Sequence, residues 1–320
     1  MKTKILPNVF IIIGVLLALT RLLAGGTANG VVDFRNMALL LTPPTIITFD
    51  APGAVNGTGV SGINPAGMIT GGYTDANNVE HGYVRAPNGT FTTYDAPGTG
   101  TMPGQGTGAN GINPAGAITG AVTDASNVNH GYVRATDGTI TTFDAPDAGP
   151  FGTIGLGINP SGVIAGHMAD ASFVFHGFVR DANGTITTFD VPGAGTGPGQ
   201  GTVGFGIDPA GVVTGAYVDA SNVIHGIVRD ANGTITTFDV PGAQGTEPFS
   251  INAPGAIVGV YGDANNVVHG FARAANGPIT TFDAPGAVNG TFPSGINPIG
   301  TITGNYSDAS GVNHGFLRTP

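Results

Sequence analysis

Histidine is the side chain in this sequence best suited to bind a metal or to transfer a proton near neutral pH. Six His-Gly pairs recur every ~44 to 49 residues, a period typical of repeated structural units, and they begin at His81, His130, His176, His225, His269 and His314. Since each histidine occupies the same position of its repeat, the six side chains should enter separate spaces between neighbouring units and cannot converge on one ion. We therefore predict structural histidines, each hydrogen-bonded to a neighbouring Asp or Thr, with no metal and no cofactor.

Aspartate also recurs, at two positions of the repeat. One set opens the turn before the His-Gly strand, where an aspartate caps its own backbone: Asp75, Asp124, Asp170, Asp219, Asp263 and Asp308. Weak calcium binding is the alternative, although such a turn offers few charged ligands. The second set ends the last strand of the repeat: Asp50, Asp95, Asp144, Asp190, Asp239 and Asp283. We predict that the second set pairs with the single arginine of each repeat or caps the following loop.

Few residues could carry catalysis. The chain has no cysteine, and a serine nucleophile on a strand-to-helix elbow is not expected because no helical periodicity is visible. Glycoside hydrolysis needs two carboxylates facing each other across a cleft, but the only glutamates, Glu80 and Glu247, lie in different repeats. His167, beside Met168, is the one histidine outside the repeated position and is an alternative functional residue. An active site requires unlike side chains, so the near-identity of the repeats argues against an enzyme.

Turn sequences divide each repeat into four short strands. In the first repeat, Pro65-Ala66-Gly67 and Asp75 to Asn78 make the first two reversals. Asn88-Gly89, a strong hairpin signal, then leads into Thr90 to Asp95. The four strands should follow one another as an antiparallel meander, which is how one propeller blade is built.

The two ends of the array indicate how it closes. A Phe-Asp strand, Thr45 to Asp50, precedes the first unit, whereas the last unit, residues 291–318, ends at Arg318 without such a strand. The spare N-terminal strand can supply the piece that the last unit lacks, and this removes the exposed edges of an open array. We predict an all-β fold, a six-bladed β-propeller over residues 45–320 that is closed by this N-terminal outer strand.

Function should lie where the repeats differ. The innermost strand varies most at the residue just before Gly-Ile-Asn: Ser61, Asn110, Leu156, Phe205, Phe249 and Ser294. In a closed ring these side chains lie near the axial opening, a setting for a ligand pocket with apolar walls and a few polar groups. The alternative is that they only plug the channel.

The first residues are typical of an export signal. Lys2 and Lys4 precede an apolar run from Val9 to Leu19, and small residues follow around Ala24 to Ala28. We predict a signal peptide at 1–28 and a linker at 29–44, with an uncleaved membrane anchor as the alternative. The net charge of −10 disfavours nucleic acid and anionic membranes, because both select basic patches.

The repeat resembles a known family of probable extracellular repeats, the HAF family, named for His-Ala-Phe. The resemblance rests on Gly-Ile-Asn-x-x-Gly-x-Ile/Val-x-Gly, a polar turn, His-small-aromatic and a closing Gly-x-Ile-x-x-Phe strand, in six copies over about residues 45–318. Here the tripeptide is His-Gly-Tyr or His-Gly-Phe, and Arg stands where the family often has Trp. The resemblance implies export and fold, and it transfers no catalytic residue.

Together these features favour an exported, non-catalytic binding or interaction module, secreted or held in the cell envelope. Its expected partner is a glycan or a protein that the sequence does not identify. A propeller enzyme acting on polysaccharide, a glycosidase or lyase, is the alternative.

Overall fold

The computed structural model describes residues 49–55, 58–307, 309 and 313–320, and its compact unit is Asp50–Pro320. The predicted signal peptide, the predicted linker and residues 45–48 of the predicted closing strand lie outside the described residues. The described residues form strands and turns. Among them, no helix has the length and apolar character needed to cross a membrane.

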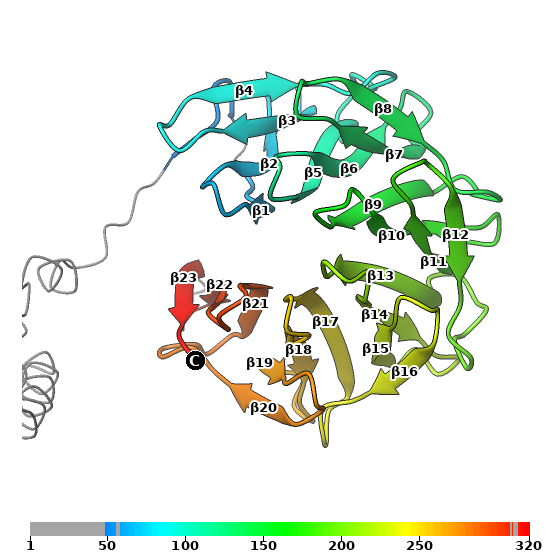
Figure 1. Cartoon of the computed structure of the whole chain (residues 1–320), viewed down its shortest axis with the longest axis vertical. Helices are drawn as coiled ribbons and strands as arrows, with labels where there is room; N and C mark the ends of the chain where they lie inside the picture. The colour runs from blue at the N-terminus through cyan, green and yellow to red at the C-terminus, as the bar shows by residue number, and fades with distance from the viewer. Residues whose placement is uncertain (1–48, 56–57, 308, 310–312) are drawn as a thin grey trace, which may run out of the picture. The chain divides into compact units, whose positions relative to one another are not determined.

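The strands recur in sets that match the sequence repeats (Figure 1). The first repeat holds β1 (Gly62–Ile63), β2 (Ile69–Thr74), β3 (Glu80–Arg85) and β4 (Phe91–Tyr94), and the second holds β5 (Gly106–Ile112), β6 (Ile118–Thr123), β7 (Asn129–Arg134) and β8 (Ile140–Phe143). The third holds β9 (Gly152–Ile158), β10 (Ile164–Ala169), β11 (Phe175–Arg180) and β12 (Ile186–Phe189), and the fourth holds β13 (Gly201–Ile207), β14 (Val213–Val218), β15 (Ile224–Arg229) and β16 (Ile235–Phe238). The fifth holds β17 (Gly245–Ile251), β18 (Ile257–Gly262), β19 (Val268–Arg273) and β20 (Ile279–Phe282), and the last holds β21 (Thr291–Ile296), β22 (Ile302–Ser307) and β23 (Asn313–Arg318).

Within each repeat the strands pair antiparallel in chain order, so the predicted meander is confirmed. The first turn closes because Asn113 Oδ1 accepts the Ala117 N–H at 2.9 Å. Gly116 in that turn has φ +94°, a left-handed conformation that glycine adopts without strain. The same turn recurs in the other repeats, with Asp208 in place of the asparagine in the fourth, which explains the Gly-Ile-Asn-Pro-x-Gly signature.

Consecutive repeats lie side by side, with the inner strands β1, β5, β9, β13, β17 and β21 toward a common centre and the outer strands at the periphery (Figure 1). Among the first four repeats, a short parallel pairing joins the third strand of one repeat to the first strand of the next, as between Glu80 and Gly106. A second link comes from the asparagine of each first turn. Nδ2 of Asn113 donates to the Asn159 carbonyl of the next repeat at 3.1 Å. These polar contacts therefore run from repeat to repeat around the centre.

Aromatic rings of the outer strands explain the glycine of each His-Gly pair. A Cβ atom on Gly131 would lie 2.5 Å from the Phe143 ring, and one on Gly177 would lie 2.5 Å from the Phe189 ring. The outer aromatic therefore covers the third strand at a point where only glycine leaves room. The residue after that glycine, such as Tyr132, is fully buried in the core.

From the second repeat on, each repeat arginine stacks on the outer aromatic of the preceding repeat. The guanidinium carbon of Arg134 lies 4.9 Å from the centre of the Tyr94 ring, and the same carbon of Arg180 lies 4.8 Å from that of Phe143. Arg229, Arg273 and Arg318 repeat this contact at 4.8 to 5.0 Å with Phe189, Phe238 and Phe282. Cation–π contacts of this kind contribute ~0.5 to 2 kcal/mol each, depending on burial. They bind neighbouring repeats together.

Candidate functional site

Five of the six variable residues share one backbone feature, a β-bulge in the inner strand. In β5, Ala109 pairs with Gly120 and Gly111 pairs with Thr119, so Asn110 is an extra residue that opposes no residue of β6. The same register shift makes Leu156, Phe205, Phe249 and Ser294 the extra residues of β9, β13, β17 and β21. Ser61 comes directly before β1, and its N–H donates to the Thr70 carbonyl at 2.9 Å. A bulge re-aims a side chain, and bulges are common beside functional sites.

The bulges lie side by side because the inner strands approach closely. A Cβ atom on Gly111 would lie 2.6 Å from the Leu156 carbonyl oxygen, and one on Gly157 would lie 2.7 Å from the Phe205 carbonyl oxygen. Asn110 Nδ2 donates to the Gly155 carbonyl at 2.9 Å, across the boundary between the second and third repeats. The structure therefore brings the predicted residues of neighbouring repeats together along the inner edge of the sheets.

The five bulge residues and Ser61 divide into an apolar and a polar group. Leu156, Phe205 and Phe249 belong to three consecutive repeats. The rings of Phe205 and Phe249 meet edge to face with centres 5.6 Å apart. Ser61, Asn110 and Ser294 carry uncharged polar groups. None of the six is ionisable, so the edge offers hydrophobic contact and neutral hydrogen bonding.

A pocket of about 560 Å³ opens beside two of these residues, Phe249 and Ser294. Its other lining residues are Phe292, Pro293, Asn305 and Ser307. Sequence comparison of the repeats missed these four, although Phe292 stands where other repeats have Gly, Ile, Val or Glu. The volume lies in the range of small-molecule pockets, and the walls are apolar with neutral polar groups.

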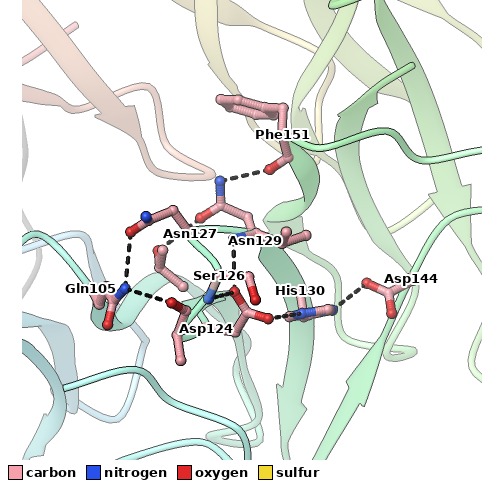
Figure 2. Close-up of polar contacts among 11 residues, drawn as sticks. Gln105, Asp124, Ser126, Asn127, Asn129, His130, Asp144 and Phe151 are labelled. Carbon is pink, nitrogen blue, oxygen red and sulfur yellow. Dashed lines mark hydrogen bonds and ion pairs between the residues drawn. The ribbon is translucent and has the colours of Figure 1, made fainter. Parts of the chain in front are cut away.

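The repeat histidines form a second polar feature, at the end of the third strands. Nδ1 of His130 lies 2.7 Å from Asp144 Oδ1, and Nε2 lies 3.6 Å from Asp124 Oδ2, so the imidazole sits between two carboxylates (Figure 2). The same arrangement surrounds His81, His176, His225 and His269. These contacts lie within one repeat and not between repeats, because β7 and β8 pair in a register that brings His130 beside Asp144.

The aspartates of this feature have two different roles. Asp124 Oδ1 accepts the N–H groups of Val128 and Ser126, each at 2.8 Å, which confirms the predicted backbone cap. These hydrogen bonds, the one from Val128 foremost, lower the pKa of Asp124. Of the two roles predicted for the second aspartate set, pairing with the repeat arginines was wrong, because Asp144 binds His130 while the arginines stack on aromatic rings. Within the described residues, no group of three or more His, Asp or Glu side chains is placed to hold a metal ion.

The two glutamates remain apart, one on β3 and one on β17. Burial raises the pKa of both carboxyl groups. His314, the sixth repeat histidine, lies on β23 opposite Tyr306. His167 lies on β10 opposite Ile154 and Gly177, and its ring contacts Phe151 and Phe175.

Comparison with solved structures identifies the fold. The chain is similar to virginiamycin B lyase from Staphylococcus aureus, with a TM-score of 0.50 and 15% identity over 81% of this chain and 83% of that one. For TolB from Acinetobacter baumannii the TM-score is 0.54 and the sequence identity is 13%, over 78% of this chain and 60% of that one. For AofleA from Arthrobotrys oligospora the TM-score is 0.53 and the sequence identity is 12%, over 81% of each chain. No protein-family model and no curated protein matches the sequence.

These similar structures are β-propellers, so the chain has an all-β, β-propeller fold built from tandem repeats. Sequence identities this low support a shared fold and no shared function. One similar structure is a lyase, and the chemistry of that protein does not transfer with the fold.

Proposed function

We propose that this protein is an exported, non-catalytic binding module of the HAF repeat type, a six-bladed propeller that holds a neutral ligand at its axial opening. The ligand belongs to a glycan or to a protein at the cell surface. The observation that carries this proposal is the set of residues before Gly-Ile-Asn, five of them on β-bulges, which presents uncharged side chains of four kinds from otherwise near-identical repeats.

Closure into six blades is supported by the two end faces of the array. Val60, on the first repeat, is 60% exposed, whereas Ala109 at the same position of the second repeat is 2% exposed. Thr303, on the last repeat, is exposed, whereas its counterparts Thr70 and Thr119 are fully buried against the next repeat. Each end face thus carries side chains that internal repeats bury, and joining the two faces would bury them.

The arginine contacts support the same closure. Every later repeat arginine stacks on the outer aromatic that precedes its repeat, as Arg134 does on Tyr94. Phe49 occupies the position of that aromatic before the first repeat. Within the described residues, Arg85 lies 5.9 Å from the ring centre of its own Phe91. A strand at 45–50 that completes the last blade would place Phe49 next to Arg85.

A glycosidase would need paired carboxylates at the opening. The bulge residues and the pocket contain no carboxylate, and the two glutamates belong to different repeats. This contrast favours binding over catalysis. Export is supported by the sequence of the first 28 residues and by the resemblance to a family of extracellular repeats.

The test is a glycan array and a polysaccharide digestion assay with the wild-type chain and with Phe249→Ser, which installs the serine that the first and last repeats carry. A binding module should retain glycans without releasing shorter sugars, and Phe249→Ser should lower retention about tenfold through loss of apolar contact, ~1.4 kcal/mol. Val55→Ser, an exposed residue outside the pocket, is the control and should bind like the wild type. Release of shorter sugars by the wild type would replace the proposal with the enzyme alternative, and equal retention by Phe249→Ser would exclude the axial site.

A further inference from the structure

The two ends of the strands differ in charge. The end that carries the histidines also carries two aspartates in most repeats, one in the turn and one after the outer strand: Asp50, Asp75, Asp95, Asp124, Asp144, Asp170, Asp190, Asp219, Asp239, Asp263 and Asp283. Within the described residues every lysine or arginine is a repeat arginine, and these lie at the opposite end of the third strands. We name the histidine-bearing end the acidic face. An acidic face raises the local concentration of cationic partners.

The third repeat breaks the pattern of this face with aromatic side chains. Where it has Phe151, the other repeats have an amide: Asn56, Gln105, Gln200, Gln244 and Asn289. Where it has Phe173, the others have Asn78, Asn127, Asn222, Asn266 and Gly311. His167 replaces Gly72, Ala121, Ala216, Val260 and Asn305, and Phe175 replaces Glu80, Asn129, Ile224, Val268 and Asn313. Phe151, His167, Phe173 and Phe175 are named the aromatic cluster.

Three of these rings are in mutual contact. The ring centres of His167 and Phe175 are 5.3 Å apart, those of Phe151 and Phe175 are 5.5 Å apart, and those of Phe151 and His167 are 6.1 Å apart. All three side chains remain partly exposed. The cluster is therefore a continuous aromatic surface, and surfaces of this kind with a polar rim mark binding sites.

The backbone of Phe173 is strained, and burial of its side chain does not compensate for that strain. Its φ is +61°, in the left-handed region where asparagine is common and a bulky residue is an outlier. Its side chain is 48% exposed. In the second repeat the equivalent pair makes a hydrogen bond instead, from Gln105 Nε2 to Asn127 Oδ1 at 3.0 Å (Figure 2). The third repeat thus gives up a hydrogen bond and accepts backbone strain in order to expose a phenyl ring, which is typical of functional sites.

His167 gives the cluster an unpartnered polar atom. Its Nδ1 is enclosed and has no hydrogen-bond partner, an uncommon situation that points to a missing ligand group. Burial lowers the pKa of His167 to about 4. The imidazole is therefore neutral at pH 7 and does not repel a cation.

We propose that the acidic face binds a lysine- or arginine-rich segment of a protein partner, and that the aromatic cluster of the third repeat anchors one of its cationic side chains. The aspartates attract the segment, and the faces of Phe173 and its neighbours hold the cation by cation–π attraction while the aliphatic stem covers the rings. This surface is separate from the axial opening, so the proposal does not depend on the ligand of that site.

The experiment measures fluorescence anisotropy of a fluorescein-labelled decalysine peptide titrated with the full chain at low ionic strength. The key variant is Phe151→Gln with Phe173→Asn, which installs the Gln–Asn pair of the second repeat and so fits the local backbone. Phe173→Asn alone is the second variant. Ile299→Ala is the matched control, because it removes an exposed apolar side chain at the opposite end and installs the alanine that stands at positions 66, 115 and 210.

We expect the wild type and Ile299→Ala to bind decalysine equally and the double variant to bind about tenfold more weakly, ~1.4 kcal/mol. Phe173→Asn alone should bind at an intermediate strength. Decalysine that is acetylated on every Nζ keeps its length and stem but loses its charge, and it should not bind. Equal binding by the double variant would overturn the anchor, and equal binding of acetylated decalysine would show an apolar docking surface instead. Absence of decalysine binding by the wild type would refute the proposal as a whole.

Discussion

The asparagine links between repeats contain one interruption, and repairing it should stabilise the protein. Asn64, Asn113 and Asn159 each donate Nδ2 to the backbone carbonyl of the next repeat, at 3.3, 3.1 and 3.2 Å. Asn252 does the same at 2.9 Å. The fourth repeat has Asp208 at this position, and a carboxylate has no N–H to donate.

Asp208→Asn should therefore add one hydrogen bond without disturbing the turn. Asp208 Oδ1 already accepts the Val212 N–H at 2.9 Å, and an asparagine Oδ1 can accept the same bond. The side chain is 4% exposed, so the new donor would face the Asn252 carbonyl in a dry environment. A buried neutral hydrogen bond contributes ~0.5 to 1.5 kcal/mol, which corresponds to a rise in Tm of roughly 1 to 6 °C for a domain of this size.

Thermal unfolding followed by circular dichroism measures this change. The matched control is Asn113→Asp, which removes the donor to Asn159 and places a carboxylate beside a carbonyl. It should lower the stability by ~1 to 3 kcal/mol, because a buried acceptor loses its partner. An Asp208→Asn protein whose Tm is unchanged or lower would refute the reasoning that these amides connect the repeats.

Three further changes test the repeat contacts. Gly131→Ala should destabilise by ~1 to 3 kcal/mol in urea unfolding, because its Cβ would overlap the Phe143 ring; wild-type stability would show that the ring moves freely. His130→Ala should cost only ~1 kcal/mol in the same assay, since its partner Asp144 is half exposed, and a loss above ~3 kcal/mol would contradict this contact as its main role. Because His167 is held neutral, with a pKa of about 4 against 6.5 unfolded, stability should fall by up to ~3 kcal/mol as the pH drops from 6.5 toward 4. A His167→Ala protein should lose correspondingly less over that interval, and equal losses would refute the assignment.

Much of the fold follows from the sequence because turn chemistry is local. The Asn-x-x-Gly and Asn-Gly turns fix where strands reverse. Because the sequence repeats, the strand order of one repeat predicts that of the others. The partners of the second aspartate set were not predicted, because they depend on strand register. The pairing of Gly131 with Phe143 in β7 and β8 sets His130 beside Asp144. A signal was present, since the His-to-Asp separation is 14 residues in every described pair.

The place of the variable residues on the inner strands could be predicted from the sequence, but the β-bulges that hold them could not. Variation before Gly-Ile-Asn marked the inner edge, whereas the bulge that aims those side chains was not expected. The length of the inner strand carries the signal, because β5 has seven residues and pairs with the six of β6. The pocket residues Asn305 and Ser307 come from β22. They could not be found by comparing inner strands alone, because their place beside β21 depends on three-dimensional pairing.

The central claim, a ring of six blades closed by residues 45–50, can be tested by one cross-link. In the first repeat Val84 pairs with Thr92, and the same register in the last blade would pair Leu317 with Ile47. The chain has no cysteine, so the variant Ile47→Cys with Leu317→Cys reports without background. Val84→Cys with Thr92→Cys is the positive control, and Ile46→Cys with Leu317→Cys, shifted by one residue, is the register control. The account predicts that the first pair forms an intramolecular disulfide as readily as the positive control and more readily than the shifted pair. A chain that forms no such disulfide, or only intermolecular ones, would contradict closure.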